Sequence, residues 1–167
     1  MKRVATMVLC LIFTAALCGC KKKYAEIQVP VNYYYCKNEY SYNSDSGIFC
    51  VEIHEGVDFR ANTKRMLDSY LLGPYADGCS NLLPENTRLV SCEMKENALT
   101  LRFSEELSQL SGVRLSMFCS CVTMTVADYT QIETVIFSAE NSQLDNKDEI
   151  ILNVADIAIT DTVALDG

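Results

Sequence analysis

The fold is decided by residues 71–104, which read LLGPYADGCSNLLPENTRLVSCEMKENALTLRFS. Gly73 and Pro74 end a helix, because glycine adopts the left-handed cap conformation and proline cannot continue the helical hydrogen bonds. Residues 75–86 are predicted as a loop. Residues 87–94 and 98–103 are predicted as strands, which the polar residues 95–97 join into a β-hairpin. The stretch therefore predicts the end of a helix, a polar crossing and a hairpin.

The hairpin and the segments on either side of it carry apolar residues at spacings that bury one face of each element. Asp58 is a candidate N-cap for the helix before the hairpin, and Ser111 begins a second helix after it. We expect both helices to pack on one face of the sheet. The helices are predicted to contribute Phe59, Thr63, Met66, Leu67, Tyr70, Leu71, Leu115, Phe118, Cys119, Val122 and Val126, and the hairpin Val90, Cys92, Met94, Leu99, Leu101 and Phe103.

Further strands complete the predicted sheet. Residues 133–139 form a final apolar strand, so the core order is helix, strand, strand, helix, strand. Residues 31–35 and 47–54 predict one or two extra strands before this core, and residues 150–152 with 157–160 a possible edge strand after it. In residues 47–54, Phe49, Val51 and Ile53 share one face, and Ile48, Cys50, Glu52 and His54 lie on the more polar one. The predicted fold class is α+β, a mixed β-sheet with two helices packed on one face.

The same stretch resembles the signature of the GerMN domain family of spore germination and sporulation proteins. That family reads as a helix ending in LLxGP, a loop, LPxGT-x-L and a hairpin whose second strand ends in D-x-S, and residues 33–142 match it. The resemblance implies a fold similar to ring-building domains. It also implies a role in sporulation, germination or cell-wall remodelling. Arg102 replaces the family's acidic residue, and Asn141-Ser142 stands where a glycine turn is usual.

The N-terminus has the features of a lipoprotein signal. Lys2 and Arg3 precede an apolar stretch that ends in Leu17-Cys18-Gly19-Cys20. The stretch is too short for a stable membrane span and resembles a lipobox. Cleavage by an ordinary signal peptidase is the alternative. We expect a signal peptide over residues 1–19, a lipid-bearing Cys20 with a tether over 20–32, the domain over 33–142, and a C-terminal extension over 143–167.

The charge of the chain bears on its partners. Two acyl chains on Cys20 would hold the protein on the outer face of the cell membrane, and Lys21 to Lys23 would lie beside anionic headgroups. The whole chain has a formal net charge of −8. Loss of residues 1–19 removes Lys2 and Arg3 and no acidic residue, which makes the charge −10. This acidity disfavours nucleic acid as a partner.

Six cysteines remain in the predicted domain and extension, namely Cys36, Cys50, Cys79, Cys92, Cys119 and Cys121. Six cysteines in an exported domain allow fifteen disulfide pairings, and sequence alone does not choose among them. Cys50, Cys92 and Cys119 stand where strands and a helix call for small apolar residues, a role that free cysteine fills well. We therefore expect mostly free thiols.

The residues with catalytic or metal-binding chemistry form no recognisable site. His54 is the only histidine and is expected to face solvent. Cys119-Ser120-Cys121 lacks the spacing of a redox or zinc pair. Residues 145–149 resemble a calcium loop, but Lys147 occupies a ligand position. Glu105 and Glu106 would be half of a glycosidase pair with no identifiable partner carboxylate. We expect no catalytic residue, no metal and no cofactor.

Two classes of function fit this sequence. The first is a non-catalytic, lipid-anchored module that assembles with envelope proteins, for example in a ring or channel. The second is a lipoprotein that senses a muropeptide or sugar through stacking tyrosines. Those tyrosines are Tyr33, Tyr34, Tyr35, Tyr40 and Tyr42, and half-buried strand positions are their simpler interpretation. A wall hydrolase is a weaker third class. The sequence names neither the partner nor the oligomeric state.

Overall fold

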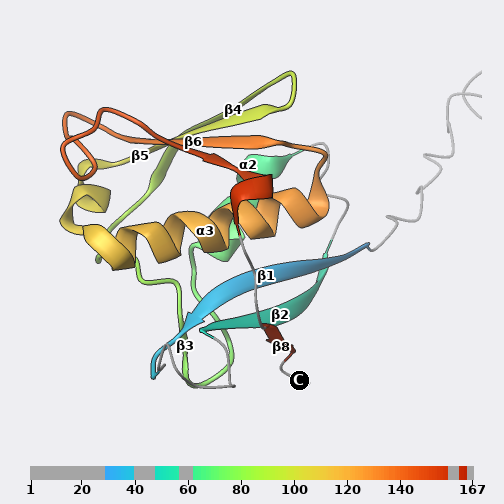
Figure 1. The fold of residues 1–167 in the computed structure, drawn as a ribbon. Helices are drawn as coiled ribbons and strands as arrows, with labels where there is room; N and C mark the ends of the chain where they lie inside the picture. Colours follow the sequence, from blue (N-terminus) through green and yellow to red (C-terminus); the bar gives the residue numbers. More distant parts are fainter. Residues whose placement is uncertain (1–28, 40–47, 57–61, 158–161, 165–167) are drawn as a thin grey trace, which may run out of the picture.

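The computed structural model describes residues 29–39, 48–56, 62–157 and 162–164, and two β-sheets with helices between them make up this part of the chain (Figure 1). The strands are β1 (Val29–Lys37), β2 (Phe49–Gly56), β3 (Cys79–Ser80), β4 (Leu89–Lys95), β5 (Ala98–Phe103), β6 (Thr134–Ala139), β7 (Ile150–Asn153) and β8 (Thr162–Ala164). The helices are α2 (Thr63–Tyr70) and α3 (Gly112–Tyr129), with 3-10 turns η2 (Glu105–Gln109) and η3 (Val154–Asp156). The α+β fold class is confirmed.

The first sheet contains the predicted hairpin and has the strand order β4-β5-β6-β7. β5 and β6 run parallel, whereas β4 pairs antiparallel with β5 and β7 antiparallel with β6. The mixed sheet is therefore confirmed, and so is an edge strand at residues 150–152. Of the other predicted edge residues, 158–160 lie outside the described ranges.

The inner face of this sheet is apolar. Leu99, Leu101 and Phe103 on β5 are fully buried. They form one core with Val135 and Phe137 of β6 and with residues from both helices. Phe103, Phe118 and Phe137 contact one another, with ring centroids 5.6 to 6.5 Å apart. The helices lie on the face of the sheet on which they are predicted.

The register of β4 differs from the prediction at one residue. A bulge falls between Leu89 and Ser91, so that Leu89 pairs with Phe103 and Ser91 with Arg102. An extra residue in one strand turns the following side chains over relative to a regular strand. As a result Leu89 is buried, whereas Val90 is exposed. Met94 lies opposite Leu99, on the core side, but is 51% exposed near the turn that ends the strand. The prediction that Val90 and Met94 belong to the core is wrong.

α2 is shorter than its apolar pattern suggests. It begins at Thr63 with Asn62 as the N-cap, whose side-chain oxygen accepts a hydrogen bond from the Arg65 amide at 3.0 Å. The predicted cap, Asp58, does not start this helix and lies with Phe59 outside the described residues. The helix ends at Tyr70, and Gly73 follows with a φ of 96°, the left-handed conformation expected of it.

α3 begins at Gly112 after Ser111, as predicted, and lies between the two sheets (Figure 1). Leu115, Phe118, Cys119, Val122 and Val126 all belong to the main core, which contains residues of both sheets. A second set, Met117, Cys121 and Met124, is buried with Cys36 of β1 and Phe49 of β2. The sequence pattern predicts one buried face of α3, whereas the helix in the structure has two. None of the described helices is long and apolar enough to cross a membrane.

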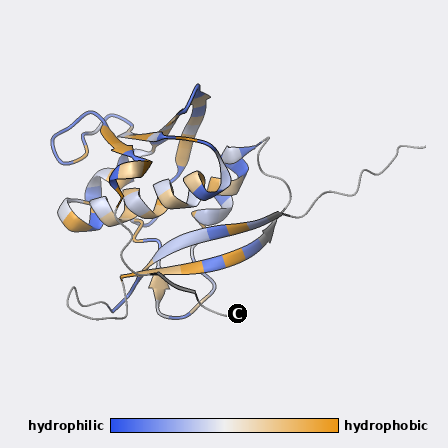
Figure 2. Cartoon of the chain, turned by 45° about the vertical axis from the view of Figure 1, so that its right-hand side comes forward, coloured by the Kyte–Doolittle hydropathy of each residue, from blue (hydrophilic) through white to orange (hydrophobic). Residues whose placement is uncertain are grey.

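The second sheet has the strand order β3-β1-β2-β8 and contains the two extra strands. β1 and β2 pair antiparallel over eight residue pairs, and β8 adds to β2 in parallel. In Figure 2, hydrophilic and hydrophobic residues alternate along part of β2, whereas much of β1 has the pale colour of intermediate hydropathy. The sequence predicts these strands but not that they form a separate sheet, because nothing local in the sequence distinguishes the two arrangements.

The faces of β2 are reversed relative to the prediction. Cys50 and Glu52 are buried, whereas Ile53 is 64% exposed. The register explains this, because Cys50 and Glu52 lie opposite Tyr35 and Tyr33, whose side chains point to the core. The more polar face of β2 is thus the inner one.

One disulfide joins Cys50 of β2 to Cys79 of β3. Cys36, Cys92, Cys119 and Cys121 are free, so the expectation of mostly free thiols holds for four of the six. The expectation that Cys50 is a free buried thiol is wrong. Because β1 lies between β2 and β3, the bond ties together both neighbours of the central strand.

Candidate interaction surface

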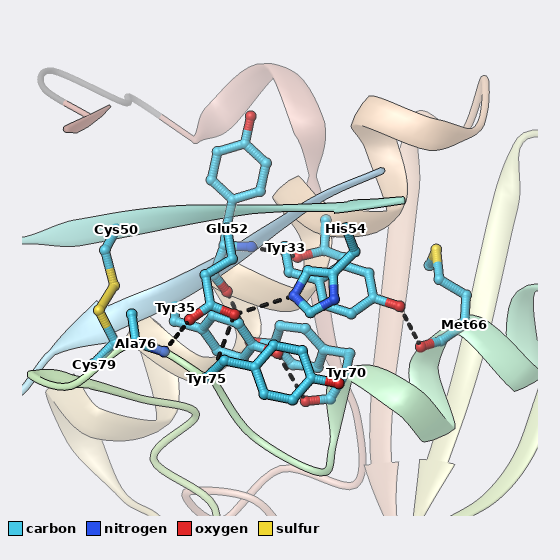
Figure 3. Close-up of polar contacts among 12 residues, drawn as sticks. Tyr33, Tyr35, Cys50, Glu52, His54, Met66, Tyr70, Tyr75, Ala76 and Cys79 are labelled. Carbon is cyan, nitrogen blue, oxygen red and sulfur yellow. Dashed lines mark hydrogen bonds and ion pairs between the residues drawn. A yellow bond between two sulfur atoms is a disulfide. The ribbon is translucent and has the colours of Figure 1, made fainter. Parts of the chain in front are cut away.

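A buried carboxylate organises the inner face of the second sheet (Figure 3). Glu52 is 8% exposed and accepts hydrogen bonds from the backbone amides of Tyr75, at 3.2 Å, and Ala76, at 2.7 Å. Its third contact is with the His54 ring, whose Nε2 lies 3.1 Å from a carboxylate oxygen. Burial of a carboxylate is costly unless hydrogen bonds replace its water shell. Glu52 meets that condition by fixing the chain that follows α2.

His54 is enclosed rather than solvent-facing. Its side chain is 17% exposed and stacks on Tyr33, with ring centroids 4.1 Å apart. The ring of Tyr75, itself largely exposed, also contacts it, with centroids 5.2 Å apart. The prediction of an exposed histidine is wrong, because its face of β2 is the one turned inward. The ring acts as a spacer between two tyrosines and as a partner for Glu52.

Tyrosine hydroxyls attach α2 to β1. Tyr33 and Tyr35 donate to the carbonyl oxygens of Met66 and Tyr70, each at 3.2 Å. In return the Tyr70 hydroxyl donates to the Tyr34 carbonyl at 2.9 Å. Burial raises the pKa of Tyr70 well above its usual value. These rings therefore stay protonated and work as neutral donors.

The tyrosine-rich strand is not an open platform for sugars. Tyr33 and Tyr35 are buried and Tyr34 is half-buried. Tyr40 and Tyr42 lie outside the described residues. The simpler sequence interpretation, half-buried strand residues, holds for Tyr34, whereas Tyr33 and Tyr35 are buried completely. Their inward direction could be read from the sequence only with knowledge of which face α2 covers.

The segment that Glu52 holds presents two large apolar side chains to solvent. We call residues 72–75 the display loop. Leu72 is 85% exposed and Tyr75 is 83% exposed. The loop is fixed at its start, since the Gly73 amide donates to the Tyr70 carbonyl and Asn81 donates to the Leu71 carbonyl, each at 3.1 Å. It is fixed at its end by the bond from the Tyr75 amide to Glu52. Apolar side chains on a fixed backbone bind a partner at a small entropic cost.

The edges of the first sheet are less suited to binding by strand addition. β4 carries Glu93 and Lys95 among its exposed residues and contains the bulge, features that hinder pairing with another chain. β7 has only four residues. In the second sheet, β8 covers part of the edge of β2. Among the described surfaces, the display loop combines the greatest apolar exposure with a fixed backbone.

The remaining sequence candidates have structural roles. Cys119 and Cys121 belong to different buried clusters on opposite sides of α3, so they form no pair. Asp145 accepts a hydrogen bond from the Gly112 amide at the start of α3, at 2.9 Å. Across residues 29–39, 48–56, 62–157 and 162–164, no three His, Cys, Asp or Glu side chains come together as a metal site.

Glu105 and Glu106 begin the turn η2. A hydrogen bond from Ser104 is the main cause that lowers the pKa of Glu106, with a smaller contribution from Arg88. The general acid of a glycosidase needs a raised pKa, so that it still holds its proton at neutral pH. The environment of Glu106 acts in the opposite direction.

The residues of the family signature in the loop and hairpin have structural roles. Asn86 occupies the glycine position of LPxGT and has a φ of 65°, a conformation that asparagine tolerates better than most residues. Thr87 then bonds back to the Pro84 carbonyl at 2.8 Å. The buried Ser104 accepts a hydrogen bond from the Arg88 amide at 3.0 Å, which joins the loop to the end of β5. Arg102 is exposed on the other face of that strand.

Comparison with known proteins agrees with this fold. The tandem GerMN domains of the sporulation protein GerM from Bacillus subtilis match with a TM-score of 0.52 and 16% identity, covering 70% of this chain and 40% of that one. The first GerMN domain of the same protein matches with a TM-score of 0.51 and 15% identity, covering 72% and 91%. At these identities the likeness concerns the fold alone. A search of curated proteins found no match.

A family match is more decisive than these structural likenesses. The Germane family, described as sporulation and spore germination, matches residues 33–145. The match covers more than half of the chain and contains both helices and the hairpin. The chain belongs to the Germane family.

Proposed function

We propose that this protein is a non-catalytic lipoprotein of the cell envelope that binds a neighbouring envelope protein through its display loop, in sporulation, germination or wall remodelling. Cys20 carries the lipid and places the domain on the outer face of the membrane. The partner contributes an apolar pocket that receives Leu72 and Tyr75. Membership of the Germane family supports the setting, and the display loop supports binding as the activity.

The observation that carries the proposal is the contrast between a fixed backbone and exposed side chains. Glu52 is one of the few charged residues buried in the described core, and two of its contacts hold the amides of Tyr75 and Ala76. Burial of a carboxylate costs free energy, and a loop without a function would not require that cost. Tyrosine is also well suited to an interface, since its large ring is rigid and carries one polar atom.

The position of the tether fits the same proposal. Residues 21–28 separate Cys20 from the start of β1 at Val29. At full extension they span about 30 Å. A lipidated Cys20 would therefore keep the domain close to the bilayer, where partners are concentrated and a modest apolar contact suffices for binding.

Co-purification from detergent-solubilised membranes tests the proposal. The wild-type lipoprotein is expected to bring down one dominant envelope protein. Leu72→Ser combined with Tyr75→Ser is expected to reduce its recovery at least tenfold, because the pocket loses both apolar anchors. Val113→Ser is the matched control, since Val113 is an exposed apolar residue at the start of α3, away from the loop.

Two outcomes would contradict the proposal. Equal recovery of the partner with the double variant would remove the display loop from the interface. Release of soluble muropeptides from purified peptidoglycan, lost in Glu105→Gln or Glu106→Gln, would favour a hydrolase. Membrane attachment is scored separately with Cys20→Ala, which should no longer partition into detergent.

A further inference from the structure

Two free cysteines from different layers of the fold face each other in the core. The Sγ atoms of Cys36, on β1, and Cys121, on α3, lie 3.4 Å apart. The residues are 85 positions apart in the sequence, and both are buried. A disulfide bond is about 2.05 Å long, so the two sulfur atoms need to approach by only about 1.4 Å.

The surroundings of this pair are apolar. Cys36 and Cys121 belong to a buried cluster with Phe49, Met117 and Met124. Burial is the main cause that raises the pKa of Cys121, and the neighbouring Cys36 adds to it. Two thiols in such a place can offer each other only a weak hydrogen bond. The bonded form removes both thiol protons and leaves an apolar link that suits the cluster.

We propose that Cys36 and Cys121 form a second disulfide, which joins β1 to α3 when the domain meets an oxidising pool of small disulfides. The Cys36 thiolate attacks a glutathione disulfide and releases one glutathione thiolate. The Cys121 thiolate then attacks the Cys36 sulfur of the mixed disulfide and releases the second glutathione. Two protein thiols are oxidised, one small disulfide is reduced to two thiols, and the two thiol protons pass to solvent or to the leaving thiolates.

The new bond would differ in effect from the existing one. Cys50–Cys79 joins strands within the second sheet. Cys36–Cys121 would join that sheet to α3, whose other face packs on the first sheet. It would thereby link the second sheet covalently to the helix that lies between the two sheets. Because the thiols are buried and Cys121 is seldom ionised, formation should be slow and should follow transient opening of the joint.

The expected oxidising surroundings rest on the proposed location outside the cytoplasm, whereas the pairing rests on geometry alone. The test therefore sets the redox conditions in the tube. The full-length lipoprotein in detergent is equilibrated with oxidised or reduced glutathione, its remaining thiols are alkylated under denaturing conditions, and tryptic peptides are mapped by mass spectrometry. After oxidation we expect residues 24–37 linked to residues 115–147, with fragmentation placing the bond on Cys121 and not on Cys119.

The controls use cysteines of the same helix. Cys119→Ala should keep the link, and Cys121→Ala should lose it while the Cys50–Cys79 peptide remains as a sign of folding. Alkylated Cys36 and Cys121 in the oxidised wild type, or a bond from Cys36 to any other cysteine, would overturn the inference. The wild-type map decides even if Cys121→Ala fails to fold. Failure of Cys20→Ala to leave the membrane would count against the proposed anchor alone.

Discussion

The two sheets of this protein bury their inner faces by different means. The first sheet uses aliphatic and phenylalanine side chains that alternate with polar ones, as on β5 and β6. The second sheet has buried tyrosines, a buried glutamate, a partly buried histidine and a disulfide on the face of β1 and β2 that meets α2. The apolar side chains of the first sheet are stabilised by close packing and by the apolar area that they bury. The buried polar groups of the second sheet must each find a hydrogen-bond partner. Two of the partners of Glu52 are backbone amides, and these bonds also fix the display loop.

We therefore expect the first sheet to contribute mainly to stability and the polar face of the second sheet to contribute mainly to function. Loss of an apolar side chain such as Leu101 should destabilise the whole fold, because it lies in the core that both sheets and both helices share. Loss of a polar contact in the second sheet should cost less and act mainly on α2 and the display loop. Substitutions in the first sheet should therefore lower the stability of the whole domain, whereas substitutions in the second sheet should act mainly on the display loop.

The largest effect is expected in the first sheet. Leu101→Ala removes a fully buried side chain at the centre of β5 and should lower the free energy of unfolding by about 2–5 kcal/mol. Thr100→Ala, the neighbour on the opposite face, should change it by less than about 0.5 kcal/mol. Urea unfolding followed by circular dichroism measures both. Similar losses for the two variants would mean that the faces of β5 are assigned wrongly.

A smaller loss is expected for the central carboxylate of the second sheet. Glu52→Ala leaves the amides of Tyr75 and Ala76 without their acceptor and should cost about 2–3 kcal/mol. Glu93→Ala removes an exposed carboxylate from β4 and serves as the control. Urea unfolding again gives the values. If both variants are as stable as the wild type, Glu52 does not hold the loop.

Alkaline pH should weaken the second sheet selectively. The folded state raises the pKa of Tyr33, Tyr35 and Tyr70 above the usual value of 10.0, mainly through burial. Unfolding then releases protons, so the stability from these neutral tyrosines is complete below about pH 10 and falls as the pH rises above it.

Tyr70→Phe isolates one of these tyrosines. At neutral pH it should cost about 1 kcal/mol, since it removes the hydrogen bond to the Tyr34 carbonyl. Between pH 10 and 11 its stability should fall less steeply than that of the wild type, because one titrating group is gone. Unfolding curves at several pH values measure this, and parallel losses in both proteins would exclude Tyr70 from the alkaline transition.

The regions also differ in how far sequence predicts them. Leu99, Leu101 and Phe103 alternate with polar residues, and Leu115, Phe118 and Val122 recur at helical spacing, so their buried faces follow from periodicity. The bulge at Val90 has no such signal, because it depends on how β4 meets β5 in space. Met117, Cys121 and Met124 were visible as apolar residues, but only a second sheet gives them something to pack against.

The candidate surface could not be predicted for a physical reason. Glu52 and His54 look solvent-facing in any local pattern, since burial of such groups depends on amides and rings far along the chain. Leu72 lies in a sequence that reads as a helix end, where nothing distinguishes a buried leucine from an exposed one. Tyr75 belongs to a predicted loop. Tertiary contacts, not local sequence, decide which of these side chains is displayed.

Glu52 bonds to the amides at the end of the display loop, while the Leu72 and Tyr75 side chains stay exposed, so we expect a rigid loop backbone. Amide hydrogen exchange, read at single residues by NMR, tests it most directly. In the wild type the amides of Tyr75 and Ala76 should exchange at least a hundredfold more slowly than an unstructured chain, although the Tyr75 side chain lies in solvent. Glu52→Ala should abolish most of that protection while the amides of β5 keep theirs. Rapid exchange at Tyr75 and Ala76 in the wild type would mean that Glu52 does not hold the loop rigid.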